Sequence, residues 1–404
     1  MLPSIKTLFK IGRGPSSSHT FAPYRASKIF LKSLENVDYD YIRVTLYGSL
    51  ALTGKGHLTD KVIYEALEGV KTIVDFDYKT QVNHPNTMIF KAYNKFSKEV
   101  KSITFISLGG GRLKIGEEIE KENNECYPFS NFNELKNYMV ENNMSIRDVV
   151  LKFDDKDILD YLETVHEAMF KSVEDGLNQE GTIAGELNLK RVAKSIYKEA
   201  LSKNNEERNL LLLTSYAYAV AEMNTGGGVI VTAPTCGSAG VIPSIIYHIE
   251  KDRKIDKERV LDGLMMAGLL GLIIRRNATI SGAVGGCQAE IGSACSMGAA
   301  LLSTAFNLSL YQVEYASELA MEHNLGLTCD PVKGYVAIPC IERNAIASFK
   351  AFNAFVLAKD IAPLRKNMVS LDDVIKVMYE TGINLSKDFK ETSKGGLAKI
   401  KVSC

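Results

Sequence analysis

The sequence predicts an α+β protein in which a small N-terminal α/β domain precedes a large, mostly helical domain. Strand-like alternation gathers in the first 125 residues, whereas a helical spacing of apolar residues dominates from about residue 160 onward. The 404 residues are enough for two domains, one of them large. We therefore expect a small domain at 1–125, a linker at 126–160 and the helical domain at 161–404.

The first domain is expected to mix strands and helices. Residues 41–47 alternate as a strand does, and residues 59–74 carry the apolar spacing of a helix. Residues 86–93 and 100–108 predict two further strands, the second of which ends at the stop signal of three glycines, 109–111.

The connecting stretch is charged and weakly patterned, with one short helix near residues 132–141. Beyond it, small residues are abundant where helices would meet, which allows close packing. The expected helices lie at 158–175, 189–203, 207–224, 237–250, 258–275, 287–306, 311–325, 340–358 and 371–381.

Composition argues against several classes of function. Apolar residues make up 46% and charged residues 24%, as in ordinary soluble proteins. Lys+Arg and Asp+Glu both number 48, so there is no basic excess for binding nucleic acid or a membrane surface. The longest apolar run, 264–274, is too short to span a bilayer, and the N-terminus lacks the apolar segment of a signal peptide.

The cysteines favour metal binding or chemistry over disulfides. There are seven, an odd number, and only Cys126 lies outside the C-terminal half. A secreted disulfide framework would be shorter and evenly paired, so we expect a reducing, cytoplasmic location.

Three cysteines form the strongest candidate site. Cys287, Cys329 and Cys340 lie in Gly-rich or Pro-bounded stretches, and a fourth, Cys404, ends the chain. Three thiolates would leave one iron of a [4Fe–4S] cluster open to a substrate, as a Lewis acid. Zinc is the alternative metal, although the chain lacks a close C-x2–4-C pair. Inert buried cysteines and an unstructured terminal Cys404 are the structural alternatives.

Two N-terminal loops carry polar groups. The GPSSSHT loop presents Ser16, Ser17, Ser18, His19 and Thr20, which suit a carboxylate or phosphate but also resemble a helix N-cap.

The loop at 47–60 offers Lys55 as a charge and His57 as a base, unless it is only a tight strand–helix turn. A third segment, HPNTM, places Asn86 in a rigid turn.

A fourth loop begins a helix after a Gly-rich segment. Thr235, Gly237 and Ser238 would lie at the helix start, where backbone N–H groups bind anions such as a carboxylate. Helix capping by Thr235 is the alternative, and Cys236 is either a ligand or a small buried residue.

The chain closely resembles the iron–sulfur-dependent bacterial L-serine dehydratases, from about residue 3 to the terminal cysteine. The resemblance rests on the motifs GPSSSHT, YGSLALTGKGH, HPNTM, TAPTCGSAG, GAVGGCQAEIGSACSM and TCDPVKGYVAIPCIERNA. Their order resembles the single-chain form, in which a β-type domain precedes a helical α-type domain. In that family the small domain looks like the allosteric substrate-binding domain of some phosphoglycerate dehydrogenases.

The resemblance implies that Cys287, Cys329 and Cys340 hold a [4Fe–4S] cluster, and that Cys404 reaches the fourth iron in the resting enzyme. It places the catalytic histidine of the GKGH motif at His57, with His19 or the released Cys404 as second choices for the base. The substrate would be held by Ser16, Ser17, Ser18, Thr20, Lys55, Asn86, Thr235, Gly237 and Ser238. The chain departs from many members at Cys236, where they carry asparagine.

The implied reaction is α,β-elimination of L-serine to pyruvate and ammonia by a homodimer. The same chemistry on L-cysteine or L-threonine is the first alternative, because Cys236 leaves substrate preference open. A cluster-based redox sensor is the non-enzymatic alternative. A pyridoxal-phosphate dehydratase is disfavoured, because no segment pairs a Schiff-base lysine with a phosphate loop.

Overall fold

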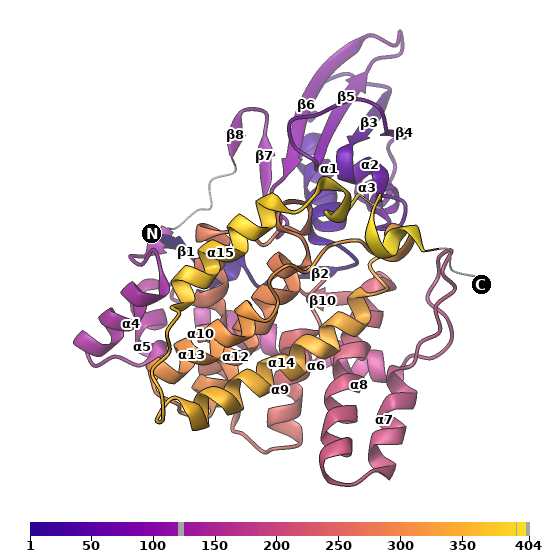
Figure 1. Cartoon of the computed structure of the whole chain (residues 1–404). Helices are drawn as coiled ribbons and strands as arrows, with labels where there is room; N and C mark the ends of the chain where they lie inside the picture. Colours follow the sequence, from indigo (N-terminus) through magenta and orange to yellow (C-terminus); the bar gives the residue numbers. More distant parts are fainter. Residues whose placement is uncertain (120–124, 393, 401–404) are drawn as a thin grey trace.

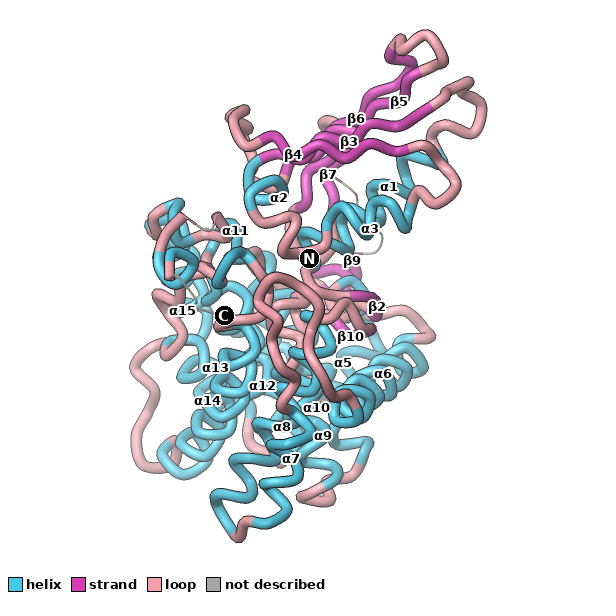
Figure 2. The backbone as a smooth tube through the Cα atoms, turned by 90° about the vertical axis from the view of Figure 1, so that its right-hand side faces the viewer, coloured by secondary structure: helices cyan, strands magenta, loops and turns pink. Residues whose placement is uncertain are grey.

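The computed structural model describes residues 1–119, 125–392 and 394–400. A small sheet domain stands on a larger helical domain (Figure 1), as the α+β class predicted. Figure 2 shows helices α1 (Ala22–Lys32) and α3 (Thr59–Ala66) between the sheet and the helical domain. The loops before these helices therefore face the larger domain.

The small domain is built on one mixed sheet with the strand order β4-β3-β5-β6-β7-β8. Strands β3 and β4 are parallel and the other pairs antiparallel. The bounds are Tyr41–Tyr47 (β3), Thr72–Asp77 (β4), Thr87–Tyr93 (β5), Glu99–Ser107 (β6), Leu113–Ile115 (β7) and Glu118–Ile119 (β8). The three strands predicted from the sequence are thus confirmed to within one residue.

One predicted element of this domain is wrong in extent. The helix expected at 59–74 ends at Ala66, and its last residues instead form β4. Gly69 adopts a φ of 82°, a conformation that glycine reaches without strain, and it turns the chain back into the sheet. The apolar residues after it then pack as a strand beside β3.

The sheet buries one face against the two helices. Ile42, Val44 and Leu46 alternate along β3 and are fully buried, together with Phe30 and Phe90. This period-2 pattern fixes which face of β3 meets the helices.

The helical domain surrounds a buried central helix, α10 (Lys257–Asn277), which packs beside α12 (Ser293–Ala305). Almost every residue of α10 from Val260 to Ile274 is buried, which explains the long apolar run in the sequence. Helices α6 (Ile158–Asn178), α9 (Val241–Lys251), α13 (Leu310–Glu322), α14 (Cys340–Ile361) and α15 (Leu371–Asn384) pack around this pair. Farther out, α8 (Asn205–Thr225) packs against α6, α9 and α14, and α7 (Ala193–Ser202) packs against α6 and α8.

Three predicted helices begin later than expected. The helix expected from residue 189 begins at Ala193, and the helix expected from residue 237 begins at Val241, after a turn. The helix expected from residue 287 opens with a π-helical turn, Gln288–Gly292, before α12. The second and third departures lie at segments that the sequence marked as site loops.

The stretch expected to be a linker belongs to the core of the helical domain. Helices α4 (Phe132–Glu141) and α5 (Ile146–Phe153) bury Phe132, Leu135 and Val149 in that core. The apolar residues of both helices recur at helical spacing despite the charged composition. Each helix therefore has an apolar face that can be buried in the core. The expected linker at 126–160 is therefore replaced by packed structure.

The N-terminus also enters the helical domain before the small domain begins. Strand β1 (Leu2–Pro3) pairs with β9 (Glu125–Tyr127), and β2 (Ile11–Arg13) pairs with β10 (Val229–Val231). Leu2, Ile5, Leu8 and Phe9 lie in the helical core. The two domains are thus tied together on both sides of the small domain.

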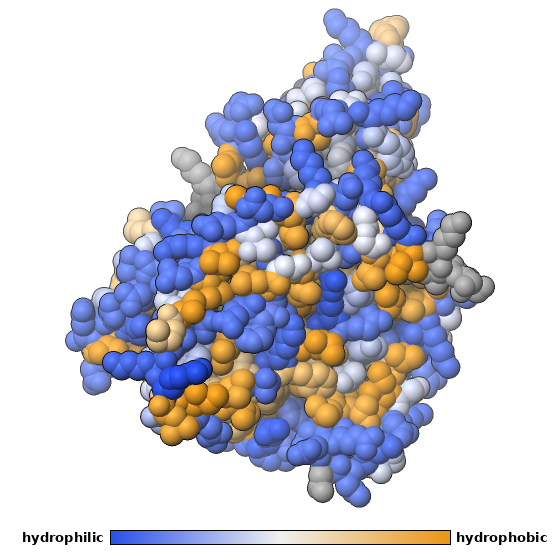
Figure 3. Space-filling view, in the orientation of Figure 1, coloured by the Kyte–Doolittle hydropathy of each residue, from blue (hydrophilic) through white to orange (hydrophobic). Residues whose placement is uncertain are grey.

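Polar and apolar residues are mixed on the face seen in Figure 3, with apolar groups gathered mainly over the helical domain. Within the described residues, no helix is both long and apolar enough to cross a membrane.

Candidate active site

The first wall of the site is the GPSSSHT loop, which forms a π-helical turn, Ser17–Phe21, before α1. The hydroxyl of Ser16 caps this turn by accepting a hydrogen bond from the backbone N–H of His19 at 3.2 Å. Thr20 braces the loop through the backbone of Ser16, both accepting from its N–H and donating to its carbonyl. The cap therefore belongs to the π-helical turn and is made by Ser16, whereas α1 itself has no side-chain cap from Ser18 or Thr20. The capped turn presents the imidazole of His19 to the interior.

His19 uses both of its ring nitrogens. Nδ1 lies 3.1 Å from the Ser18 hydroxyl, while Nε2 lies 2.9 Å from the Thr53 hydroxyl and 3.2 Å from the carbonyl oxygen of Ser49. A carbonyl only accepts, so Nε2 carries the proton. Complete burial, assisted by neighbouring His57, holds the pKa of His19 well below its usual value.

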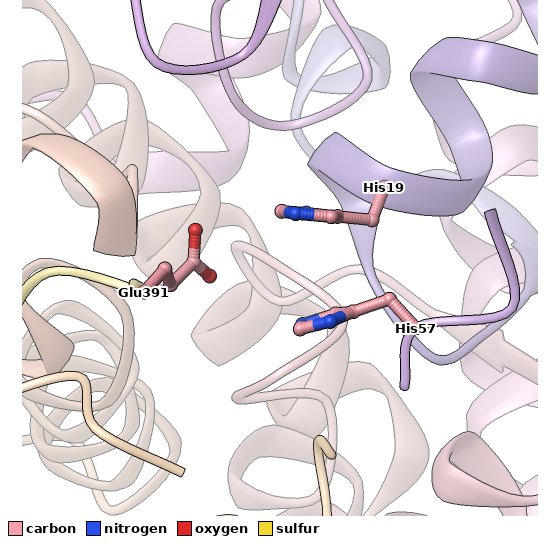
Figure 4. A group of neighbouring side chains, drawn as sticks. All are labelled: His19, His57 and Glu391. Atoms are coloured by element: carbon pink, nitrogen blue, oxygen red, sulfur yellow. The ribbon is translucent and has the colours of Figure 1, made fainter. Parts of the chain in front are cut away.

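His57 stacks on His19 with a ring separation of 4.1 Å and an angle of 23° (Figure 4). It follows the short helix α2 (Gly48–Leu52), and its Nδ1 lies 2.8 Å from the carbonyl oxygen of Thr53. Nδ1 is therefore the donor, and Nε2 keeps an unshared lone pair. Burial lowers the pKa of His57 to about 4, so the ring is neutral near pH 7.

Glu391 faces the two imidazoles from the segment after α15, as Figure 4 shows. Ligand atoms of His19, His57 and Glu391 all lie within 4.8 Å of one another. The backbone of Glu391 is fixed by its own N–H, which donates to Cys329 O at 2.7 Å, and by the Ser49 hydroxyl, which donates to Glu391 O at 2.9 Å. Burial, and then the charge of Glu290, raise the pKa of Glu391 to about 8.

The second wall holds the cysteines predicted as ligands. Cys287 precedes the turn Gln288–Gly292, Cys329 lies in a loop, and Cys340 begins α14. All three line one small cavity, together with Pro15, Ser16, His57, Gly237, Glu290, Pro331, Val336 and Glu391. The six described cysteines are free thiols, and the predicted fourth ligand, Cys404, lies outside the described residues.

The thiols of the three cysteines are buried, and this changes their acidity. Burial raises the pKa of Cys287 to about 11 and the pKa values of Cys329 and Cys340 well above normal. The pKa values of Cys329 and Cys340 are raised further by Cys287. Arg343 supplies positive charge at Cys287.

The loop before α9 reaches the cavity through Gly237. A Cβ atom at this position would lie 3.1 Å from a carboxylate oxygen of Glu290, so a glycine keeps this space open. The Thr235 hydroxyl donates to Glu290 at 2.6 Å, and the Ser238 hydroxyl bonds within the turn. Cys236 is buried in the core beside α8 and does not line the cavity.

Several predicted residues are not brought to the cavity. Lys55 is exposed, with its ammonium 5.7 Å above the ring of Phe76. Asn86 is fully buried behind α2, and its side-chain amide has no hydrogen-bond partner among the described residues. Ser17 is buried in the loop but does not line the cavity.

Two carboxylates of the site were missed by the sequence analysis. Glu290 is the one charged residue of the stretch GAVGGCQAEIGSACSMGAA, and a lone charge among small and apolar residues is a usable signal. Glu391 stands in a charged segment near the C-terminus, where nothing in the local pattern sets it apart.

Most of the chain matches two models of known protein families. Residues 84–398 match the family described as serine dehydratase alpha chain, and residues 4–77 match serine dehydratase beta chain. The chain belongs to the serine dehydratase family. The resemblance and the order of β-type before α-type region are thereby confirmed. The two matches divide the sheet between β4 and β5, earlier than the expected boundary at residue 125.

Full-length relatives agree with this membership. An L-serine dehydratase of Streptomyces coelicolor is 38% identical over the whole of both chains. An L-serine dehydratase of Escherichia coli K12 is 39% identical, and one of Helicobacter pylori 26695 is 37% identical, each over 98% of both chains.

Proposed function

We propose that this protein deaminates L-serine to pyruvate and ammonia by α,β-elimination. The relatives named above are L-serine dehydratases, which favours serine over cysteine and threonine, and an enzyme over a sensor. The observation that carries the proposal is one cavity lined jointly by three thiols and by an imidazole with a free nitrogen. The cytoplasmic location and the homodimer expected from the sequence belong to the same proposal.

Cys287, Cys329 and Cys340 would hold a [4Fe–4S] cluster in this proposal, with Cys404 as the resting-state ligand of the fourth iron. The three cysteines line one cavity, and their thiolates are the donor set that such a cluster requires. When bound, the cluster would supply a Lewis acid that stabilises the departing hydroxide.

His57 would remove the α-proton of the substrate through Nε2. The Thr53 carbonyl fixes the tautomer in which that nitrogen is unprotonated, and the low pKa keeps the ring neutral. His19 is a weaker candidate because both of its nitrogens are engaged; it would instead hold His57 in place by stacking.

The substrate carboxylate would lie near Ser16 and Gly237, which line the cavity from opposite domains. A hydroxyl and a backbone N–H in a turn are suitable donors for a carboxylate. Ser18, Thr20, Thr235 and Ser238 would support this subsite by bracing their loops rather than by direct contact.

The decisive experiment measures pyruvate formed from L-serine by protein reconstituted anaerobically with iron and sulfide, before and after exposure to air. We expect activity that falls in air and returns with ferrous iron and reductant. Activity that is indifferent to air would contradict the cluster, and absence of pyruvate from a fully iron-loaded protein would contradict the reaction.

A further inference from the structure

Two carboxylates flank Cys329 and face the cavity. Glu290, Cys329 and Glu391 each offer a ligand atom, and these atoms lie within 4.8 Å of one another. The two carboxylates come from segments about a hundred residues apart, the turn before α12 and the segment after α15. They are placed together only by the fold, and both line the same cavity as His57.

The two carboxyl groups have few partners among the residues that the structure describes. No lysine or arginine in that part of the chain forms a salt bridge with either group, although the charge of Arg343 partly offsets the raised pKa of Glu290. The guanidinium of Arg343 interacts with Cys287 and donates to Thr328 O at 2.6 Å. Glu391 is 5% exposed, and its Oε2 is buried without a hydrogen-bond partner in the described residues.

Cys329 provides a weak donor to the pair. Its thiol lies 4.0 Å from Glu290 and is also within hydrogen-bonding reach of Glu391. The unpartnered Oε2 of Glu391 is left for a donor from outside the described residues.

Gly282 packs directly against both carboxyl groups. A Cβ atom on Gly282 would lie 2.6 Å from Glu290 Oε2 and 3.1 Å from Glu391 Oε1. Only a residue without a side chain can therefore take this position without displacing the carboxyl groups. A primary ammonium, with its three N–H donors, suits two carboxylates at this separation.

We propose that Glu290 and Glu391 form the subsite for the α-ammonium of the substrate. This inference rests on the proposed function and adds to it the group that recognises the amine. Ligand atoms of Glu391 and His57 lie within 4.8 Å of each other. An ammonium held by Glu391 would therefore bring the neighbouring Cα–H toward Nε2 of His57. The same carboxylates would exclude hydroxy acids that lack the amine.

The test compares L-serine with L-glycerate, in which a hydroxyl replaces the ammonium. Binding of each is measured by calorimetry to anaerobically reconstituted protein, for wild type, Glu391→Gln, Glu290→Gln and the remote surface control Glu141→Gln. We expect each site variant to bind L-serine about 10- to 100-fold more weakly, as the loss of a charge-assisted hydrogen bond implies. Glycerate binding should be unchanged or tighter, and iron content should stay at the wild-type and control level.

An unchanged serine-to-glycerate ratio in iron-replete variants would overturn the ammonium subsite. So would a loss of iron at normal selectivity, which would make the carboxylates part of cluster assembly. If a glutamine variant does not fold, Thr235→Val removes only the hydroxyl that orients Glu290 and should lower the ratio by a smaller factor. If the protein binds serine selectively but forms no pyruvate, the proposed reaction is contradicted and the ammonium subsite is still supported.

Discussion

The cavity has one wall from the small domain and one from the helical domain. The two walls differ in how many of their polar side chains have hydrogen-bond partners within the protein. On the small-domain wall, His19 is hydrogen-bonded to Ser16 and to Thr53. The Nδ1 atom of His57 is also hydrogen-bonded, whereas its Nε2 has no hydrogen-bond partner among the described residues. On the helical wall, three buried thiols and the carboxyl groups of Glu290 and Glu391 line the cavity, and Oε2 of Glu391 has no partner among the described residues. In our proposal the first wall provides the base, and the second holds the cluster and the substrate ammonium.

The largest expected effect tests the helical wall. Replacing Cys329 with alanine should abolish both iron binding and pyruvate formation, because one of the three thiols that we propose as cluster ligands is lost. Iron and acid-labile sulfide per chain provide the measurement. Cys295→Ala is the matched control, since Cys295 is a buried cysteine of α12 outside the cavity and should keep its iron. Full iron in Cys329→Ala would show that this wall is not a cluster site.

The next effect tests the small-domain wall. His57→Gln should lower kcat by about 10²- to 10⁴-fold, as the loss of a general base does, while iron content stays normal. The comparison variant is His19→Gln, which loses stacking and hydrogen bonds but no free nitrogen, so its loss should be smaller. A larger loss of kcat in His19→Gln than in His57→Gln would make His19 the base and His57 the residue that supports it.

A third prediction concerns pH and the stability of the same wall. The pKa of His57 is about 4 in the folded protein and near 6.5 when unfolded, so the unfolded chain binds more protons between these values. Stability should therefore fall by up to about 3 kcal/mol as pH drops from 6.5 to 4. The free energy of unfolding is measured by urea titration of the cluster-free protein at several pH values in this range. In His57→Gln this free energy should depend less steeply on pH. An equal slope in the variant would assign the titration to other groups.

The smallest effect concerns the contact that joins the walls. Ser49→Ala removes the hydroxyl that donates to Glu391 O, at a cost of about 1 kcal/mol in the free energy of unfolding. A shift in the urea midpoint at constant slope is the expected result. If serine binding weakens as well, the contact also positions the Glu391 carboxylate. No change in either quantity would mean that the walls are held together elsewhere.

Residue chemistry in local patterns accounts for what could be predicted of the site. Cysteines are scarce and stood beside glycine or proline, and His57 stood in a loop between a strand and a helix, so both were found from sequence. Lys55 was predicted because it lies two residues before His57, but its side chain extends over Phe76 instead. Glu391 carried no local signal, because its role depends on backbone pairing with Cys329, 62 positions away.

The same reasoning explains the errors in the fold. Gly69 was read as part of a helix because the apolar spacing continued across it, whereas its positive φ ends the pattern. Residues 126–160 were predicted to be a linker with one short helix, because their charge masked the second helix, α5, and the packing of both helices in the core of the larger domain. Marginal helices of this length gain their stability from packing.

The sequence by itself determined the fold class, the order of the two domains, and the choice of thiols and imidazole that we propose to carry the chemistry. These follow from periodicity and residue type, which are local properties of the chain. Only the tertiary structure decided which imidazole nitrogen is free, and that Ser49, 342 positions from Glu391, fixes it beside His57. Contacts over such separations leave no local pattern, because they depend on how the core closes around them.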